Sequence, residues 1–257
     1  SLGLLLESTG RHEEAALLLR LALEGREAAL GPESPETLES MGDLAGILQK
    51  MGKYEKAEVL RRRILASCEN ALGSMHLSTL SALDALTRVL QDEGKLDEAE
   101  PLLWAVLECR DEQLGPLHRD TVESVNRLAE LLDEMEKRRE AESMYRRALE
   151  ANEAVWGCLH PRTLGCLHRF GVLLHSTGKL EEAKRALRRA AEGRDAVLGP
   201  SHPLTIASLS RLAGVTRAAG GREDAVAAYR RVLKERTGTL GPTHPATLVS
   251  LSLLATL

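Results

Sequence analysis

Apolar residues recur along most of this chain at the spacing of amphipathic helices. One such stretch runs from Pro203 to Gly220. Its apolar positions are Ile206, Leu209, Leu212, Ala213 and Val215, among which separations of three and four residues recur. This spacing places them on one face of a helix. Pro203 suits the first helical position, where its missing N–H would be unpaired anyway, and Gly220 with Gly221 favours a helix end.

A second apolar stripe follows almost at once and predicts a helix from about Glu223 to Leu240. Its inward positions are Ala225, Val226, Tyr229, Val232 and Leu233. Because the connection is very short, the two helices must pack antiparallel. Neither helix can bury its stripe alone, so we expect stacked neighbours to do it.

This helix pair recurs with a period of 42 residues and without insertions. The glycines that end the second helices are Gly31, Gly73, Gly115, Gly157, Gly199 and Gly241. Three residues on lie Ser34 and then His76, His118, His160, His202 and His244; three further on lie Thr37, Thr79, Thr121, Thr163, Thr205 and Thr247. A second landmark is Ala15, Ala57, Ala99, Ala141, Ala183 and Ala225. A fixed period of this size predicts a helical solenoid.

The composition agrees with an all-α fold. Hydrophobic residues make up 43% of the chain and are mostly Leu and Ala, whereas aromatic residues make up only 2%. Leu, Ala, Glu, Arg and Lys favour helices, while strands favour the β-branched and aromatic residues that are scarce here. A solenoid needs few large rings, because each unit packs small apolar side chains against its neighbours.

Charge and cysteine content exclude several classes of protein. The chain carries 34 Lys and Arg against 38 Asp and Glu, a net charge of −4, so it lacks the basic footprint of a nucleic-acid binder. No apolar stretch approaches the ~18 residues of a transmembrane helix, so we expect no membrane partner. The first residues lack the features of a signal peptide. Four cysteines do not make a disulfide framework, and a reducing, cytoplasmic location is the expectation.

Within each unit the residues resemble the tetratricopeptide repeat. Leu128-Ala129 is followed by Ala141, Tyr145 and Ala148, and Leu212-Ala213 by Ala225, Tyr229 and Val232. The proline that usually ends the second helix is replaced by Glu27, Glu69, Asp111, Glu153 and Asp195. We therefore expect the second helix to run about two turns longer, which converts the usual ~34 residues into 42.

The 42-residue form, with Leu-Gly-Pro-x-His-Pro between units and Gly-Lys-x-x-Glu-Ala within them, resembles the repeats of kinesin light chains. It is also similar to arrays in nephrocystin-type proteins and in signalling proteins with nucleotide-binding modules. The resemblance implies a right-handed α-α superhelix of antiparallel helix pairs. It predicts one array over residues 1–257, with a partial repeat at 1–35, full repeats starting near 36, 78, 120, 162 and 204, and a partial helix at 246–257.

Neither end of this array carries the polar cap that terminal repeats normally need. Residues 1–10 are expected to form the last part of a first helix, and Leu248, Leu251 and Leu254 place an apolar stripe on the final one. The expectation is that the chain is a fragment of a longer array.

The resemblance implies that the first helix of each pair, helix A, lines a concave groove that holds an extended peptide. Kinesin light chains carry Asn-Asn before the Leu-Ala pair, and only Asn126 retains one of these here. Arginines occupy the position directly before this pair in several repeats, and a guanidinium can bind a carboxylate through two parallel hydrogen bonds. The predicted peptide-binding residues are Asn126, Arg127, His168, Arg169, Ser210, Arg211 and Arg217. With Asp43 and Asp84 in the first half, we predict a charge gradient and a ligand whose acidic segment meets the second half.

A structural interpretation of these arginines stays open. Arg127 lies at helical spacing from Glu123 and Glu130, which could neutralise it on a solvated face. Arginines in phase also arise simply by duplication of repeats. The second helix of a pair, helix B, carries adjacent arginines in several repeats, and these are expected on a solvated outer face: Arg62-Arg63, Arg146-Arg147, Arg188-Arg189 and Arg230-Arg231. Two of these arginines are expected to pair with a glutamate four residues earlier, as Glu58–Arg62 and Glu142–Arg146.

No motif predicts catalysis, a cofactor or a metal. The chain has no Gly-rich phosphate loop, no G-x-S-x-G and no H-E-x-x-H. Cys158 with His160 and Cys166 with His168 suggest zinc ligands, but Cys166 and His168 lie roughly 200° apart on a helix and cannot easily share a metal. The recurrent histidine is expected in the turn between repeats, hydrogen-bonded to a helix terminus.

We therefore predict a non-catalytic scaffold that binds peptide segments or partner domains in its groove. Because Trp, Tyr and Arg dominate binding hot spots and aromatics are few, arginine is the main anchor. One alternative is a structural, oligomerisation or autoinhibitory arm of a larger signalling or motor-associated protein, with self-association through the apolar ends. Another is an accessory to an enzyme whose chemistry lies in another domain.

Overall fold

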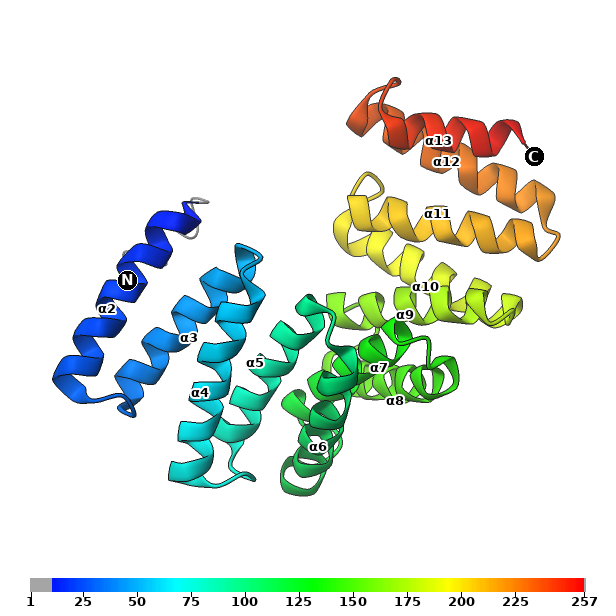
Figure 1. Cartoon of the computed structure of the whole chain (residues 1–257). Helices are drawn as coiled ribbons and strands as arrows, with labels where there is room; N and C mark the ends of the chain where they lie inside the picture. Colours follow the sequence, from blue (N-terminus) through cyan, green and yellow to red (C-terminus); the bar gives the residue numbers. More distant parts are fainter. Residues whose placement is uncertain (1–10, 257) are drawn as a thin grey trace. The chain divides into compact units, whose positions relative to one another are not determined.

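The computed structural model describes residues 11–256, and every regular element in that part is a helix (Figure 1). The helices are α2(His12–Leu30), α3(Pro35–Lys50), α4(Tyr54–Leu72), α5(Leu77–Glu93), α6(Leu96–Leu114), α7(Arg119–Glu134), α8(Arg138–Trp156), α9(Pro161–Ser176), α10(Leu180–Leu198), α11(Pro203–Ala218), α12(Arg222–Leu240) and α13(Pro245–Ala255). The all-α prediction is confirmed. The helix expected in residues 1–10 lies outside the described residues.

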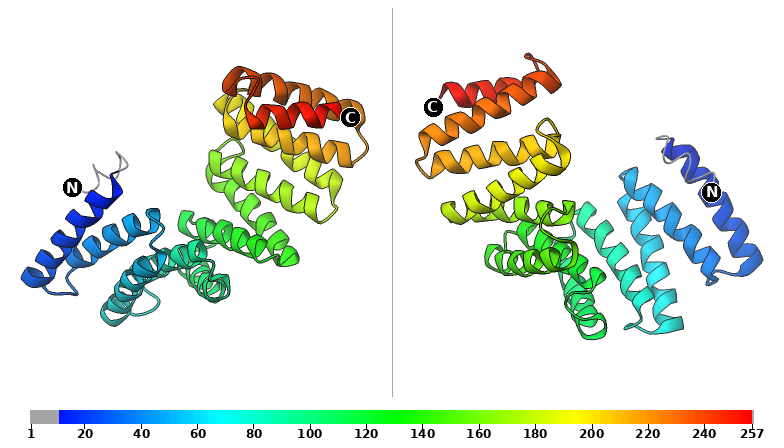
Figure 2. Two further views of the ribbon diagram at one scale, coloured as in Figure 1. Left: turned by 45° about the horizontal axis from the view of Figure 1, so that its top comes forward. Right: turned by 180° about the vertical axis from the view of Figure 1, so that it is seen from behind.

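The chain forms two compact units, the first ending at Gln113 and the second beginning at Leu114. The first contains α2 to α5 and nearly all of α6, and the second contains α7 to α13. Within each unit, helices that follow one another along the chain pack antiparallel as pairs (Figure 2). No helix in the described part is both long and apolar enough to cross a membrane.

The two helices of a pair differ in length, as the acidic residue in place of proline predicts. Helix B has 19 residues in every pair, whereas helix A of the complete pairs has 16 or 17. Asp195 lies inside α10, and its carbonyl accepts the N–H of Gly199 beyond the helix end. A proline at that place would remove a helical hydrogen bond and end α10 earlier.

Small apolar side chains packed between neighbouring helices form the core of each unit. In α7, Val125, Leu128 and Leu132 are fully buried. Two aromatic rings of this region also meet, since Tyr145 of α8 and Phe170 of α9 have centroids 6.1 Å apart. Burying an aliphatic or phenyl side chain of this size contributes about 1.5–3 kcal/mol, so every helix is stabilised chiefly by its neighbours.

The turn between repeats is built from the recurrent glycine, histidine and threonine. Gly157 has a φ of +88°, a conformation that glycine adopts without steric cost. Its carbonyl accepts a hydrogen bond of 2.8 Å from Thr163 Oγ1. His160 Nδ1 accepts the backbone N–H of Arg162 at 3.2 Å and so caps α9. The same histidine cap begins α5, α7, α11 and α13, which confirms the predicted role of this residue.

The charged face of helix B links successive repeats. The predicted pairs Glu58–Arg62 and Glu142–Arg146 are both present. Arg146 Nη2 also lies 2.6 Å from Glu182 Oε2 on α10, 36 residues away. Arg62 Nη2 likewise meets Glu98 at 2.9 Å. The exposed arginines of helix B therefore bridge neighbouring helices as well as facing solvent.

Candidate functional site

The second unit carries a hollow of about 500 Å³ whose centre is one face of α11. The α11 residues that line it are Ala207, Ser210, Arg211, Gly214 and Arg217. Ser210 and Arg211 are adjacent, and the others follow at intervals of three or four residues, so all five share a face of the helix.

Neighbouring helices complete the walls of this hollow. His168 and His175 come from α9, Tyr229 and Arg236 from α12, and Leu253 from α13. The other two helices A that contribute to the hollow are α9, which precedes α11 in the array, and α13, which follows it. The hollow therefore lies on the helix-A surface of the second unit.

Small residues keep the floor of the hollow open. Gly214 stands where the preceding helix A has Val172. A Cβ built on Gly214 would lie 3.6 Å from the hydroxyl oxygen of Tyr229, an ordinary van der Waals contact. The absence of a side chain on Gly214 therefore leaves space next to Tyr229, which is 3% exposed.

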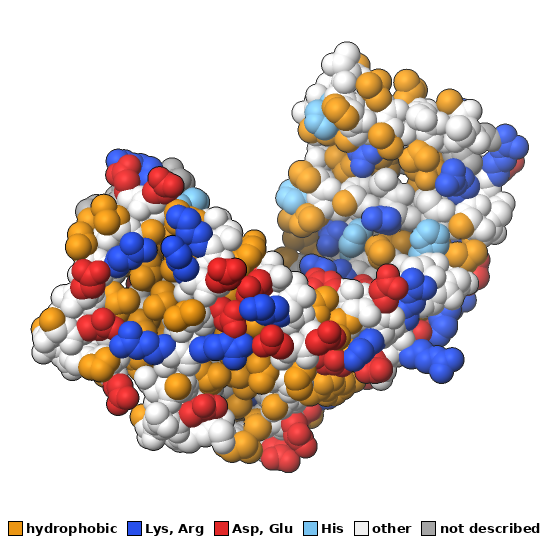
Figure 3. Space-filling view, in the orientation of Figure 1, with side chains coloured by type: hydrophobic (Ala, Val, Ile, Leu, Met, Phe, Trp, Pro, Cys, Tyr) orange, Lys and Arg blue, Asp and Glu red, His pale blue; other side chains and the backbone are white. Residues whose placement is uncertain are grey.

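The walls carry the positive charges of three arginines and no negative charge. Of the residues that line the hollow, five are Arg or His and none is Asp or Glu: His168, His175, Arg211, Arg217 and Arg236. In the space-filling view, Lys, Arg and His side chains gather over the face formed by α9 to α13 (Figure 3). Charges of one sign in a shared hollow focus the local field and attract counter-ions.

Four of the seven predicted site residues meet in this hollow: His168, Ser210, Arg211 and Arg217. Arg211 and Arg217 are exposed, and neither forms an ion pair within residues 11–256. Their guanidinium donors are therefore available to a ligand.

Arg169 is placed differently, because it already has an acidic partner. Its Nε lies 3.0 Å from Glu130 Oε1 of α7. Burial raises the pKa of Glu130, and the positive charges of Arg169 and Arg127 partly oppose that rise. Glu130, which the sequence placed beside Arg127, thus forms an ion pair with Arg169, whose side chain is nevertheless 53% exposed.

Asn126 is engaged inside its own repeat. Its Nδ2 donates to Val122 O at 2.7 Å and to Asn152 Oδ1 at 3.1 Å, and Asn152 Nδ2 donates back to Asn126 Oδ1 at 2.8 Å. Arg127, the next residue on α7, is half-buried. The structure therefore separates Asn126 and Arg127 from the four residues of the hollow.

The predicted charge gradient was wrong at Asp84. This residue is only 6% exposed, and its Oδ2 lies 2.5 Å from Arg110 Nη1 of α6. A buried carboxylate needs a partner because desolvating an unpaired charge is costly, and Arg110 supplies one. Asp84 holds α5 and α6 together and offers no charge to a ligand.

Sequence reasoning missed a second set of arginines, which connects helix B to the following helix A. Arg194 Nη1 donates to Leu204 O at 3.1 Å and to Ser208 Oγ at 2.7 Å. Arg236 donates in the same way to Ala246 O and Ser250 Oγ. We call this arrangement the arginine–serine brace.

The brace has a signal in the sequence, since both partners recur in phase. The aligned pairs are Arg26 with Ser40, Cys68 with Ala82, Arg110 with Ser124, Asn152 with Cys166, Arg194 with Ser208, and Arg236 with Ser250. Wherever the arginine is replaced, the serine is replaced as well. An alignment of the six repeats that looked for positions replaced together would have found the arginine–serine brace.

His168 is positioned by the brace of its neighbours. Its Nδ1 lies 3.1 Å from Ser208 Oγ, the oxygen that Arg194 also contacts. Burial lowers the pKa of His168 to about 4, with the nearby charges of Arg194, Arg211 and Arg169 acting in the same direction. The imidazole is therefore neutral at pH 7.

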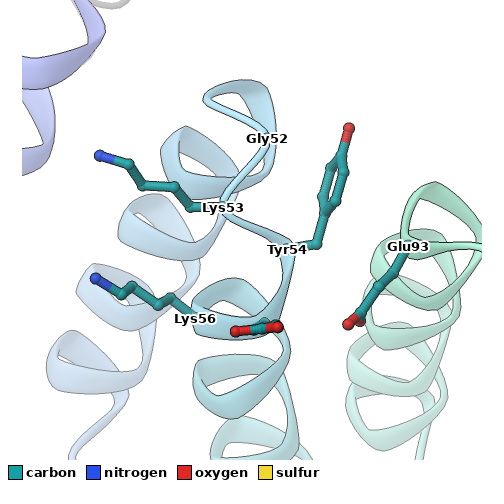
Figure 4. A pocket seen from close by; sticks show the side chains of 6 residues that line it. Gly52, Lys53, Tyr54, Lys56 and Glu93 are labelled. Atoms are coloured by element: carbon teal, nitrogen blue, oxygen red, sulfur yellow. The ribbon is translucent and has the colours of Figure 1, made fainter.

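A smaller hollow of about 270 Å³ lies in the first unit, at the turn that begins α4 (Figure 4). It is lined by Gly52, Lys53, Tyr54, Glu55, Lys56 and Glu93. Lys53 and Lys56 extend away from Tyr54 and Glu93, so the charges do not converge. The corresponding turn before α10 has a similar hollow, which marks it as a feature of the repeat. Within residues 11–256, no three His, Cys, Asp or Glu side chains are grouped to hold a metal ion.

Comparison with protein families gives matches over most of the chain. The family model described as tetratricopeptide repeat matches residues 1–70, 42–103, 78–154 and 162–234. No curated protein matches the sequence at a significant level.

Solved structures similar to this chain are also repeat proteins. A putative kinesin light chain from Podosopora anserina with nearly identical TPR-like repeats is 26% identical, with a TM-score of 0.72 over 80% of this chain and 98% of that chain. BtubC from P. vanneervenii is 23% identical, with a TM-score of 0.77 over 91% of this chain and 94% of that chain. YrrB, described as a TPR protein with an unusual peptide-binding site, is 16% identical, with a TM-score of 0.58 over 90% of this chain and 98% of that chain.

Proposed function

The chain belongs to the tetratricopeptide repeat family, and from that premise we propose that it binds an extended peptide on the helix-A surface of its second unit. Proteins of this family are generally non-catalytic scaffolds for protein–protein interaction. We propose that the ligand places an acidic segment in the hollow around Arg211 and Arg217, and that the chain functions as one array of repeats without catalysing a reaction.

One observation carries this proposal. Residues chosen from the helix-A register alone, among them His168, Arg211 and Arg217, line a common hollow that contains no carboxylate. In a solenoid, a continuous surface of this kind is what a partner can contact. The YrrB structure, described by its peptide-binding site, supports a peptide as the type of ligand.

The two free arginines are well suited to anchor such a ligand. Arg211 and Arg217 are exposed and form no ion pair within residues 11–256, so a ligand can bind them without first breaking one. Bidentate bonds between guanidinium and carboxylate are about twice as strong as neutral hydrogen bonds. We therefore assign most of the electrostatic contribution to these two residues.

The remaining predicted residues have secondary roles in this proposal. Arg169 can exchange Glu130 for a carboxylate of the ligand, because its side chain is more than half exposed. Asn126 and Arg127 extend the same register onto α7, where the amide of Asn126 also holds Asn152.

We further propose a reducing, cytoplasmic compartment for this chain. All four cysteines are free: Cys68, Cys109, Cys158 and Cys166. Disulfides are rare in reducing compartments, so unpaired thiols are in keeping with such a location.

A second candidate function is assembly through apolar helix faces. On α13, Leu248, Val249 and Leu251 are each about half exposed, and on α2 Leu17 and Leu21 are 57% exposed. Self-association through these faces would make the mass measured by light scattering rise with concentration. Replacing Leu248 and Leu251 by Glu would then abolish that rise.

Peptide binding can be tested with labelled peptides of opposite charge. A Glu-rich degenerate library and a Lys-rich library of equal length are titrated with the protein at about 0.15 M salt, where exposed charges are partly screened. We expect the acidic library to bind and the basic one not to. Arg211→Glu with Arg217→Glu should weaken binding by at least about tenfold, equivalent to ~1.4 kcal/mol.

A matched control makes the same charge change elsewhere in the second unit. Arg188→Glu with Arg230→Glu alters two exposed arginines of helices B and should leave binding unchanged. The pair Arg169→Glu and Arg211→Glu should also weaken binding. Equal affinity for wild type and for both groove variants would overturn the proposed function.

A further inference from the structure

We propose that the hollow around α11 is a phosphate site, selective for the phosphomonoester of a phosphorylated serine or threonine within the bound peptide. This inference rests on the proposed function, because it names the group that the peptide presents to the hollow. It depends on three features: the number of cationic donors, their positioning, and the shape of the floor.

The donors outnumber what one carboxylate can accept. Arg211, Arg217 and Arg236 line the hollow together with His168 and His175, and no carboxylate shares it. A carboxylate has two oxygens and one negative charge. A phosphomonoester carries a charge of about −1.5 to −2 at pH 7 and three strong acceptor oxygens, so it balances this set better.

Arg236 is held in place before any ligand arrives. Its Nη1 donates to Ala246 O at 3.0 Å and to Ser250 Oγ at 2.7 Å. These bonds leave the donors on Nε and Nη2 for other acceptors. A cation fixed by the fold loses little side-chain entropy on binding, which raises affinity.

His168 can add a neutral donor on the α9 side. Arg194 donates to Ser208 Oγ, so the serine hydroxyl hydrogen can be directed at His168 Nδ1. In that tautomer the hydrogen of the imidazole is on Nε2, which becomes a donor for an anion. Ser210, between the histidine and arginine walls, provides a further hydroxyl.

The shape of the hollow favours an anion on a side chain. Gly214, Ala207 and Ser210 leave the floor open above Tyr229, whereas Leu253 on α13 provides an apolar edge. A volume of about 500 Å³ is within the range of small-molecule sites and exceeds what a single free phosphate needs. The extra room and the apolar edge suit the flanking residues of a peptide.

The test compares three fluorescent peptide libraries that differ at one central residue and are degenerate on both sides. The centre is phosphoserine, glutamate or serine, and affinity is measured by anisotropy at about 0.15 M salt. We expect the phosphoserine library to bind at least about tenfold more tightly than the glutamate library, and the serine library to bind weakest. Free phosphoserine and inorganic phosphate serve as competitors and should displace the peptide only at much higher concentration.

Two variants assign the binding to the hollow. Arg211→Gln with Arg217→Gln should reduce phosphopeptide affinity to that of the serine library, while Arg188→Gln with Arg230→Gln should have no effect. Gly214→Val fills the floor without changing any charge and should also abolish the phosphate preference. The valine at the equivalent Val172 shows that a helix A of this chain accommodates it. Helical circular dichroism and the unfolding temperature verify that each variant is folded.

The outcomes separate the inference from the proposed function. If the glutamate library binds as tightly as the phosphoserine library and still depends on Arg211 and Arg217, the phosphate site is overturned but peptide binding stands. If inorganic phosphate competes as well as the phosphopeptide, the hollow is a small-anion site and the inference fails. If no library binds in a way that depends on these arginines, both are wrong.

Discussion

Arg194 of α10 donates from Nη1 to Ser208 Oγ of α11 over 2.7 Å, and both side chains are buried. The same serine oxygen lies 3.1 Å from His168 Nδ1, so one hydroxyl joins three helices of the second unit. Equivalent braces at Arg26 and Arg236 show that this contact is part of how repeats stack.

The brace predicts energetic coupling between Arg194 and Ser208. We expect Arg194→Cys to cost about 2–3 kcal/mol of unfolding free energy and Ser208→Ala about 1–2 kcal/mol, because each leaves a buried polar group short of a partner. The double variant should cost less than the sum by about 1 kcal/mol, which a double-mutant cycle in urea measures. Cys68 and Ala82, which pack in one apolar cluster at the equivalent positions, are the chain's own precedent for the double change.

The control for this cycle is Arg188→Ala on the exposed face of α10, which should change stability by less than about 0.5 kcal/mol. Strict additivity of the two buried changes would contradict the brace.

His168 makes stability depend on pH in a defined window. Its pKa is about 4 in the folded chain and about 6.5 when unfolded, so the unfolded state takes up the proton first as pH falls. The contribution of His168 to the unfolding free energy should therefore be at its maximum above pH ~6.5. It should decrease by up to about 3 kcal/mol as the pH falls toward 4, and the unfolding free energy should not depend on this group below pH 4. Chemical denaturation at a series of pH values measures the decrease.

His168→Asn removes this titration, and Asn126 shows that asparagine occurs naturally at the equivalent position. Subtracting the two pH profiles isolates His168 from the other titrating groups. A difference that does not vary between pH 4 and 6.5 would exclude a half-buried neutral imidazole.

Glu136 carries backbone strain that glycine would relieve. Its φ is +57°, and among the described residues it is the one non-glycine with a positive φ. The equivalent residues in the other repeats are Gly52, Gly94, Gly178 and Gly220. A left-handed conformation costs a residue with a Cβ about 1–2 kcal/mol, so Glu136→Gly should stabilise the chain by about 1 kcal/mol despite the flexibility it adds to the unfolded state. Thermal unfolding of the variant measures this, and Glu136→Ala, which keeps the Cβ, should bring no comparable gain.

The histidine caps should be replaceable by serine but not by alanine. His202 Nδ1 accepts the N–H of Leu204 at 3.2 Å and caps α11. His202→Ala should cost about 1 kcal/mol, as losing a helix cap typically does. His202→Ser should restore most of it, since Ser34 caps α3 in the same register. Equal losses for both variants would show that the ring contributes by packing alone.

Much of the fold could be predicted because it is local and repeated. Pro203 and Gly220 predicted the limits of a helix that spans Pro203–Ala218, and the acidic residue at Asp195 predicted the long helix before it. The capping histidines were also predictable, because a cap joins residues only two apart along the chain. Six copies in phase strengthen each of these signals.

The candidate site could be predicted only in part. The helix-A register alone placed His168, Arg211 and Arg217 on one surface, because helix geometry determines which residues share a face, and in the structure these three side chains line one hollow. It could not show that Glu130 pairs with Arg169, or that Arg110 buries Asp84. Those partners lie 39 and 26 residues apart on different helices.

The repeat, its helices and their caps thus follow from the order of residues, since local hydrogen bonds and a 42-residue period specify them. Which charges remain free for a ligand follows from the packing of one helix against the next. A guanidinium reaches several residues on neighbouring helices, and the distances between those helices select its partner. Arg211 and Arg169 occupy the same position in successive repeats, yet only Arg169 has an acidic side chain within reach in the described part of the chain.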